Sequence, residues 1–195
     1  ERKGHESTRY DRCRFDRQGV IRPAGFIQSQ RAVIDAHGAL PGIDRAGIAT
    51  VIPTPENEFV LLDAGANTEC TPLHLAHYAI MGSVYSSEVL GYAKPRVGLL
   101  CNGTEDSKGI PLTQAAFQLC QRLDLNFIGN VEGHDLFAGK VDVVVCDGFV
   151  GNITLKTSES LATGMFRFLK RELTRNPLRK LGAFLARGAF KAVRK

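Results

Sequence analysis

Short apolar runs alternate with amphipathic stretches along the chain from Leu40 onward. The apolar runs have the length and β-branched content of strands, and they cover residues 48–52, 59–62, 96–101, 126–131 and 141–145. Helical periodicity predicts helices over about 71–90, over 112–123 and from about Asn152 onward. This order predicts an α/β fold with three layers, α/β/α, around a mostly parallel sheet.

Two local signals sharpen this prediction. The segment 53–57 between the first two strands holds two prolines and an asparagine, which predicts a hairpin. Thr71 and Pro72 have the residue types that begin a helix, a hydroxyl at the cap and proline in the first turn. That helix has an apolar stripe, the side of a helix that ordinarily packs on a core, formed by Leu73, His77, Ile80, Met81 and Val84.

The pattern divides the chain into three parts. The hydrophobic positions of residues 1–38 follow neither the period of a helix nor that of a strand for long. We expect these residues to be an atypical segment that is disordered or translated from another reading frame. Residues 39–175 form the α/β core, and residues 176–195 form a basic amphipathic tail. The 195 residues are 44% hydrophobic, without an apolar run of membrane-spanning length or a signal peptide, so we expect a cytoplasmic protein. Five scattered cysteines without a CxxC pair predict neither disulfides nor a zinc site.

The most informative segment for function joins the strand at 141–145 to the long helix. Asp147 and Asn152 follow the strand's carboxyl end, where open α/β sheets bind ligands. Gly148 and Gly151 are expected to let the backbone turn tightly and approach a bound group. Free N–H groups at the start of the helix would favour an anion.

Other turns that follow strands carry similar chemistry, and a parallel sheet collects such turns along one edge. Asparagine amides and glycine-rich backbone offer donors for a phosphate or an oxyanion. We predict catalytic roles for Asn130, Asn152 and Lys156. We predict substrate binding by Asn67, Asn102, Lys108, Gly129, Asp147, Gly148, Gly151 and Thr157. The alternative is that the glycines only shape turns and the lysines only face solvent.

Several familiar chemistries are not indicated. The dinucleotide motif GxGxxG and the P-loop motif are missing, and His74 and His77 lack a third partner for a metal. We therefore predict no cofactor and no metal. No serine or cysteine nucleophile is apparent either, so in an acyl transfer a positioned phosphate would itself be the nucleophile.

Several strings resemble one family, the PlsX-type phosphate acyltransferases of bacterial phospholipid synthesis. They are LPGIDR at 40–45, LLDAGAN at 61–67, MGSVY at 81–85, PRVGLL at 95–100, NFIGNVEG at 126–133 and GKVDVVVCDGFVGNITLKTSE at 139–159. The resemblance implies a fold similar to isopropylmalate dehydrogenases and phosphotransacetylases. It also implies formation of acyl phosphate from acyl-acyl carrier protein and inorganic phosphate.

The same resemblance implies further partners: acyl carrier protein, inorganic phosphate, a membrane-bound glycerol-3-phosphate acyltransferase that consumes the product, and a second copy in a homodimer.

Departures from the family pattern favour an alternative function. The DAMGGD and SAGNTG motifs are missing, Thr71 stands where lysine is common, and the family continues past Lys195. The chain is therefore expected to be incomplete at both ends, and the alternative function is an inactive module that binds membrane or carrier protein.

The tail has its own chemistry, with ten basic residues against one acid between Arg167 and Lys195. Leu178, Leu181 and Leu185 fall on one helical face, and basic residues fall on the other. We predict peripheral binding to an anionic membrane through these leucines, as the resemblance also implies. A helix that packs in a dimer or on the core is the alternative, and nucleic acid is not expected as a partner because no base-reading motif accompanies the charge.

Overall fold

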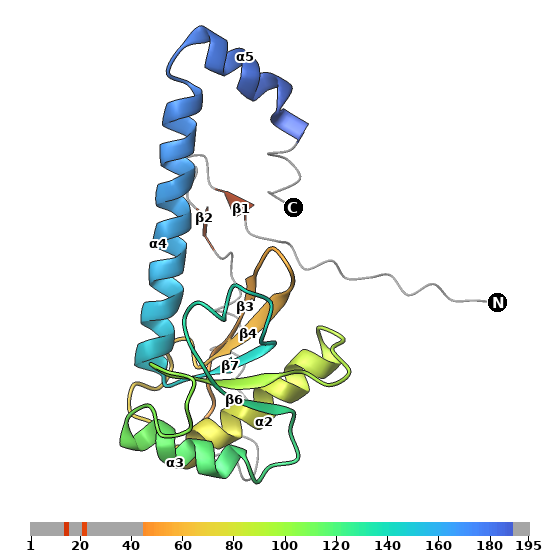
Figure 1. Cartoon of the computed structure of the whole chain (residues 1–195), viewed down its shortest axis with the longest axis vertical. Helices are drawn as coiled ribbons and strands as arrows, with labels where there is room; N and C mark the ends of the chain where they lie inside the picture. Colours follow the sequence, from red (N-terminus) through yellow and green to blue (C-terminus); the bar gives the residue numbers. More distant parts are fainter. Residues whose placement is uncertain (1–13, 16–20, 23–44, 189–195) are drawn as a thin grey trace, which may run out of the picture. The chain divides into compact units, whose positions relative to one another are not determined.

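A five-stranded sheet forms the centre of the fold in this computed structural model, which describes residues 14–15, 21–22 and 45–188. Its strands are β3 (Ala49–Pro53), β4 (Glu58–Leu62), β5 (Val97–Leu100), β6 (Phe127–Val131) and β7 (Val143–Val145). They lie in the order β3-β4-β7-β5-β6 (Figure 1). All neighbouring pairs are parallel except the β3–β4 hairpin. The predicted α/β fold with a mostly parallel sheet is confirmed.

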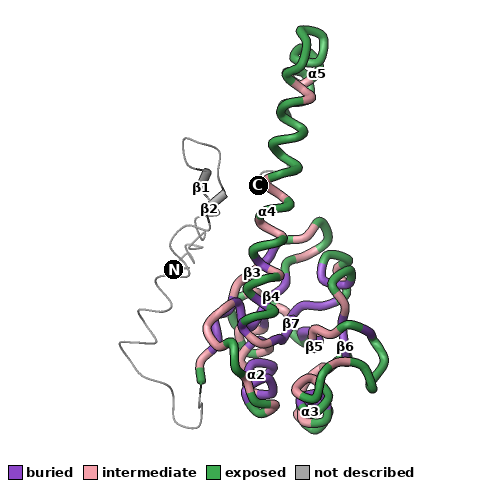
Figure 2. Tube along the Cα trace, turned by 90° about the vertical axis from the view of Figure 1, so that its left-hand side faces the viewer, coloured by how far each residue is buried: buried purple, intermediate pink, exposed green. Residues whose placement is uncertain are grey.

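Helices α2 (Pro72–Glu88) and α3 (Pro111–Cys120) cover one face of this sheet. Alternate residues of the central strands point to that face, as the two-residue period of a strand requires. The opposite face buries the other alternate residues, among them Phe59 and Val144, beneath Leu136, Val141 and Leu155. The central strands β4, β7 and β5 are mostly buried, as the colours of Figure 2 show. Leu155 comes from the long helix α4 (Gly148–Leu173) that follows β7.

The chain divides into two compact units, of which residues 27–155 form one and residues 1–26 with 156–195 form the other. The second unit includes the far part of α4, helix α5 (Pro177–Leu185) and the two-residue strands β1 (Arg14–Phe15) and β2 (Ile21–Arg22). Our predictions for residues 1–13, 16–20, 23–44 and 189–195 lie outside the described residues. No helix among the described residues is long and apolar enough to cross a bilayer.

The predicted bounds of α2 are close to the observed ones, and Met81 packs on the core as predicted, but the predicted core stripe is wrong for three of its five residues. Leu73, Ile80 and Val84 are exposed, and the helix instead buries Leu75 and Tyr78 together with small residues. The reason is close packing: a Cβ at Gly82 would collide with the Val143 side chain on β7. Only a small residue fits at this contact, whereas Leu75 and Tyr78 fill the core beside it.

An ion pair fixes the amino ends of β5 and β7. Asp142 accepts hydrogen bonds from the Arg96 backbone N–H at 2.8 Å and from its guanidinium at 2.8 and 2.9 Å. Burial opposes ionisation of Asp142, but the bonds from Arg96 outweigh it and lower the pKa of that carboxyl. This pair lies at the edge of the sheet opposite to the predicted site.

Candidate active site at the carboxyl edge of the sheet

The carboxyl ends of β4, β5, β6 and β7 share one edge because these four strands run parallel. The turns that follow them therefore lie along that edge, which is where open sheets of this kind bind ligands. These turns carry most of the predicted site residues. Their hydrogen bonds show which polar groups are available to a substrate.

The turn after β4 is organised around a buried carboxylate, that of Asp63. Its Oδ1 accepts hydrogen bonds from the backbone N–H groups of Ile48, Gly65 and Ala66 at 3.0, 3.0 and 2.9 Å. Its Oδ2 accepts from the N–H of Asn67 at 2.8 Å. The carboxylate occupies the position that a bound anion would take in this turn, so these N–H groups are not available to a substrate.

Asn67 closes the same turn. Its Nδ2 lies 2.8 Å from the Ala46 carbonyl, 3.0 Å from Asp63 Oδ2 and 2.8 Å from the Tyr78 hydroxyl. The backbone carbonyl oxygen of Asn67 accepts a hydrogen bond from the N–H of Gly148 at 2.7 Å. The side-chain donors are therefore engaged within the protein, and a substrate contact by Asn67 would have to use its Oδ1.

The cysteines near this turn are poor nucleophiles. Burial raises the pKa of the Cys70 thiol, although a hydrogen bond with Tyr78 partly opposes the shift. Burial also raises the pKa of Cys146. Thiols with a raised pKa stay protonated at neutral pH, and the thiol is a far weaker nucleophile than the thiolate.

Helix α4 begins at Gly148, four residues earlier than predicted. Asp147 Oδ1 accepts from the N–H groups of Phe149 and Val150 at 2.9 and 3.0 Å, and its carbonyl accepts from Gly151 at 2.9 Å. With Gly148 bonded to Asn67, the first four N–H groups of the helix all have partners within the protein. The prediction that free N–H groups here would favour an anion is therefore wrong, because Asp147 caps the helix.

Gly148 and Gly151 are helical residues that pack, not the turn residues that we predicted. A Cβ at Gly148 would lie 2.6 Å from the carbonyl oxygen of Asn67 and 2.8 Å from its nitrogen. A Cβ at Gly151 would overlap the Asp63 carbonyl oxygen. Both glycines let the start of α4 lie directly against the turn after β4, which fixes the position of the next residue, Asn152.

Asn152 is exposed and lies over Gly65, where an added Cβ would be 3.3 Å from the Asn152 Cβ and 3.5 Å from its Oδ1. Its side chain makes no hydrogen bond to another described residue and remains available to a substrate. Lys156 is exposed and pairs with Glu159 at 3.1 Å, and Thr157 is exposed. Both residues come about two turns after the start of α4.

Two other predicted residues, Asn102 and Lys108, lie on the exposed loop between β5 and α3. Within the described residues neither makes an ion pair, and the only side-chain bond at Asn102 is a weak one from the Cys101 thiol, 3.5 Å from its Oδ1. Asn130 on β6 is only 6% exposed. Its Nδ2 donates to the Glu105 carbonyl on this loop at 2.9 Å. Asn130 is thus enclosed, whereas Asn102 and Lys108 are accessible.

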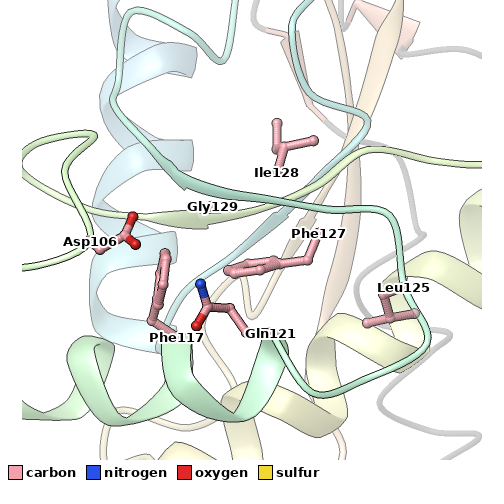
Figure 3. Close-up of a pocket in the computed structure, with 7 residues that line it drawn as sticks. All are labelled: Asp106, Phe117, Gln121, Leu125, Phe127, Ile128 and Gly129. Atoms are coloured by element: carbon pink, nitrogen blue, oxygen red, sulfur yellow. The ribbon is translucent and has the colours of Figure 1, made fainter.

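A pocket of about 290 Å³ lies beside the predicted residues and includes one of them, Gly129. Figure 3 shows Asp106 at one end of it and Leu125 at the other. The remaining lining residues are Phe117, Gln121, Phe127 and Ile128. Gly129 has a φ of 94°, a conformation that side chains other than glycine's rarely adopt. The pocket adjoins Asn130 and the β5–α3 loop, but it does not include the Asp63 turn or Asn152.

The predicted membrane-facing residues Leu178, Leu181 and Leu185 are all exposed on α5. Asn176 caps this helix by accepting from the N–H of Arg179 at 2.8 Å. The Arg179 guanidinium pairs in turn with Glu172 on α4 at 2.7 Å, across the corner between the two helices. The described part of the tail is thus an amphipathic helix with exposed leucines, and most of α5 has the colour of exposed residues in Figure 2.

Comparison with known proteins first defines the fold class. The structure is similar to the EutD phosphotransacetylase from Staphylococcus aureus, with a TM-score of 0.53 and 24% identity over 68% of this chain and 47% of that chain. The fold is therefore that of the phosphotransacetylases.

Sequence comparison then identifies the family. The profile of the family described as fatty acid synthesis protein matches residues 31–195, and the chain belongs to that family. A phosphate acyltransferase from Nitratidesulfovibrio vulgaris is 52% identical over 79% of this chain and 45% of its own length. One from Leptospira biflexa is 45% identical over 91% of this chain and 53% of its own length. The chain thus spans about half the length of the curated relatives that it matches.

Proposed function

We propose that this chain is the part of a phosphate acyltransferase that holds the phosphate. The proposed reaction transfers the acyl group of acyl-acyl carrier protein to inorganic phosphate. An oxygen of hydrogen phosphate attacks the thioester carbonyl, and the tetrahedral oxyanion collapses with cleavage of the C–S bond. Acyl phosphate forms, and the carrier leaves as its thiol with the proton that phosphate gives up. Membership in a family whose curated members bear the name phosphate acyltransferase carries this proposal.

The hydrogen bonds favour side chains as the groups that bind phosphate and the oxyanion. The backbone donors after β4 and at the start of α4 are taken by Asp63 and Asp147. Asn152, Asn102 and Lys108 remain available at the carboxyl edge, and they supply amide donors and a cation. In such a site the protein positions phosphate and stabilises charge, and it needs no covalent intermediate. Lys156 and Thr157 are proposed to contribute farther along α4.

The test is to incubate the purified chain with acyl-acyl carrier protein and phosphate and to trap acyl phosphate as a hydroxamate. Asn152→Ala should slow product formation on the order of 10²-fold, the usual cost of one oxyanion donor, with little loss of stability because the side chain is exposed. If the chain forms no product but binds carrier protein or vesicles, the alternative function, a binding module, replaces the enzyme.

We also propose that α5 binds an anionic membrane surface, where the membrane-bound glycerol-3-phosphate acyltransferase would consume the product. Apolar insertion resists salt, whereas each basic residue contributes about 1 kcal/mol that salt screens. Replacing Leu181 and Leu185 by glutamate should therefore weaken sedimentation with anionic vesicles even at low salt. Equal sedimentation of parent and variant would assign α5 to packing, and a shift toward monomer in light scattering would then place it in the proposed homodimer.

A further inference from the structure

Asn130 is a buried amide that reaches out of the sheet to an exposed loop. It is 6% exposed on β6, and its Nδ2 donates to the carbonyl oxygen of Glu105 at 2.9 Å. The same carbonyl accepts the backbone N–H of Lys108 at 3.0 Å. One oxygen therefore joins the amide of Asn130 to the backbone of Lys108.

Stability does not explain an asparagine at this position. Its Oδ1 is buried and has no hydrogen-bond partner among the described residues. A buried acceptor without a donor costs about as much as one ordinary hydrogen bond contributes, or more. Leucine branches at the same carbon and carries no such penalty, so the amide of Asn130 gives the fold little net stability.

What the amide does supply is a fixed point for the loop. Residues 104–108 are all exposed, and few other bonds tie the loop to the rest of the unit. The Gln114 side chain holds its end by donating to the carbonyls of Ser107 and Gly109 at 2.8 and 3.3 Å. The hydrogen bond from Asn130 to the Glu105 carbonyl holds the middle of the loop. The stem of Lys108 then packs over Gly103, where a Cβ would lie 2.7 Å from the Lys108 Cγ.

We propose that Asn130 is a positioning residue, which holds the β5–α3 loop so that Lys108 presents its ammonium group to phosphate at the carboxyl edge. This inference rests on the proposed function and changes the role predicted for Asn130 from direct catalysis to an indirect one. The pocket in Figure 3 borders the same junction, since Asp106 follows Glu105 and Gly129 precedes Asn130. A loop released from Asn130 would therefore also alter that pocket.

The test compares Asn130→Leu with Asn126→Leu in the full chain. Asn126 is a matched control because its Nδ2 also donates to a loop carbonyl, that of Lys94, at 3.1 Å, but next to the opposite end of β6. Asn130→Leu should leave the melting temperature unchanged or raise it. It should speed hydrogen exchange of the amides at 105–108 on the order of tenfold, the value of one hydrogen bond, and Asn126→Leu should not.

Phosphate binding, followed by ³¹P NMR with inorganic phosphate, supplies the second readout. Asn130→Leu should weaken it on the order of tenfold in the parent and have no further effect in a Lys108→Met background. Equal weakening in both backgrounds would overturn the proposal and indicate that Asn130 itself contacts phosphate.

Two further outcomes are decisive. A lower melting temperature with unchanged exchange at 105–108 would assign Asn130 to the core and overturn the proposal. A parent chain that binds no phosphate would count against the proposed function, whereas the exchange comparison would still decide whether Asn130 holds the loop. If Asn130→Leu does not fold, Asn130→Ala removes the same donor and is measured by the same exchange.

Discussion

Replacing Gly151 by alanine should destabilise the protein, although alanine is the better helix former. The added Cβ would overlap the carbonyl oxygen of Asp63 and lie 2.9 Å from its carbonyl carbon and 3.0 Å from the Cys146 sulfur. Asp63 is fully buried and anchored by the hydrogen bonds of its turn, so its backbone has no room to retreat. Either α4 or the turn after β4 must move.

The magnitude follows from two opposing effects. Overpacking in a filled core costs about 1–3 kcal/mol, and a clash with anchored backbone belongs at the upper end, about 3 kcal/mol. Alanine in place of glycine in a helix returns about 1 kcal/mol. The expected net loss is about 2 kcal/mol, which in a chain of this size lowers the melting temperature by roughly 4–8 °C.

Thermal and urea unfolding followed by circular dichroism measure this loss. Gly164→Ala is the matched control, because Gly164 lies on the same helix and an added Cβ there meets nothing within 4 Å. The free energy of unfolding of the control variant should rise by up to about 1 kcal/mol from helix propensity alone. Equal stability of the two variants would show that the contact between α4 and the Asp63 turn is looser than described.

Two further predictions concern buried carboxylates. Asp63→Asn places an amide where four backbone N–H groups converge, so it should cost about 2–3 kcal/mol in urea unfolding, and a change below about 0.5 kcal/mol would contradict that role. Asp142→Asn should cost about 2 kcal/mol at pH 7, because it weakens the pair with Arg96. The folded-state pKa of Asp142 is lowered, so its stabilisation is full above the unfolded pKa of about 3.9 and is lost as pH falls through the folded value. The deficit of Asp142→Asn should therefore shrink below about pH 4, and a deficit that does not vary with pH would refute this account.

The sheet could be predicted from the sequence because its signals are local. The run of valines before Asp147 has the composition of a strand covered on both faces, and β7 is buried on both. Thr71 and Pro72 predicted the start of α2, where the Thr71 side chain does cap the helix. The exposed side of α2 could not be predicted, because the close approach of Gly82 to Val143 depends on tertiary packing.

The site could be predicted only as a set of turns on one edge. Which polar groups remain available depends on hydrogen bonds that composition does not show. Asp63 was missed as the organiser of its turn, although an aspartate followed by small residues and an asparagine is a signal for a turn closed by side-chain bonds. Asp147 was predicted to bind substrate, and the structure shows it capping α4. Its role toward substrate stays a prediction.

The outer side of α2 has a consequence for how the protein behaves in salt. Helices α2 and α3 carry one charged residue between them, Glu88, and α2 exposes Leu73, Ile80 and Val84. A surface with so little charge has little repulsion for salt to screen, and sulfate strengthens apolar contacts. Association through α2 would therefore increase with ammonium sulfate, whereas binding of anions by the basic tail would decrease as salt is added.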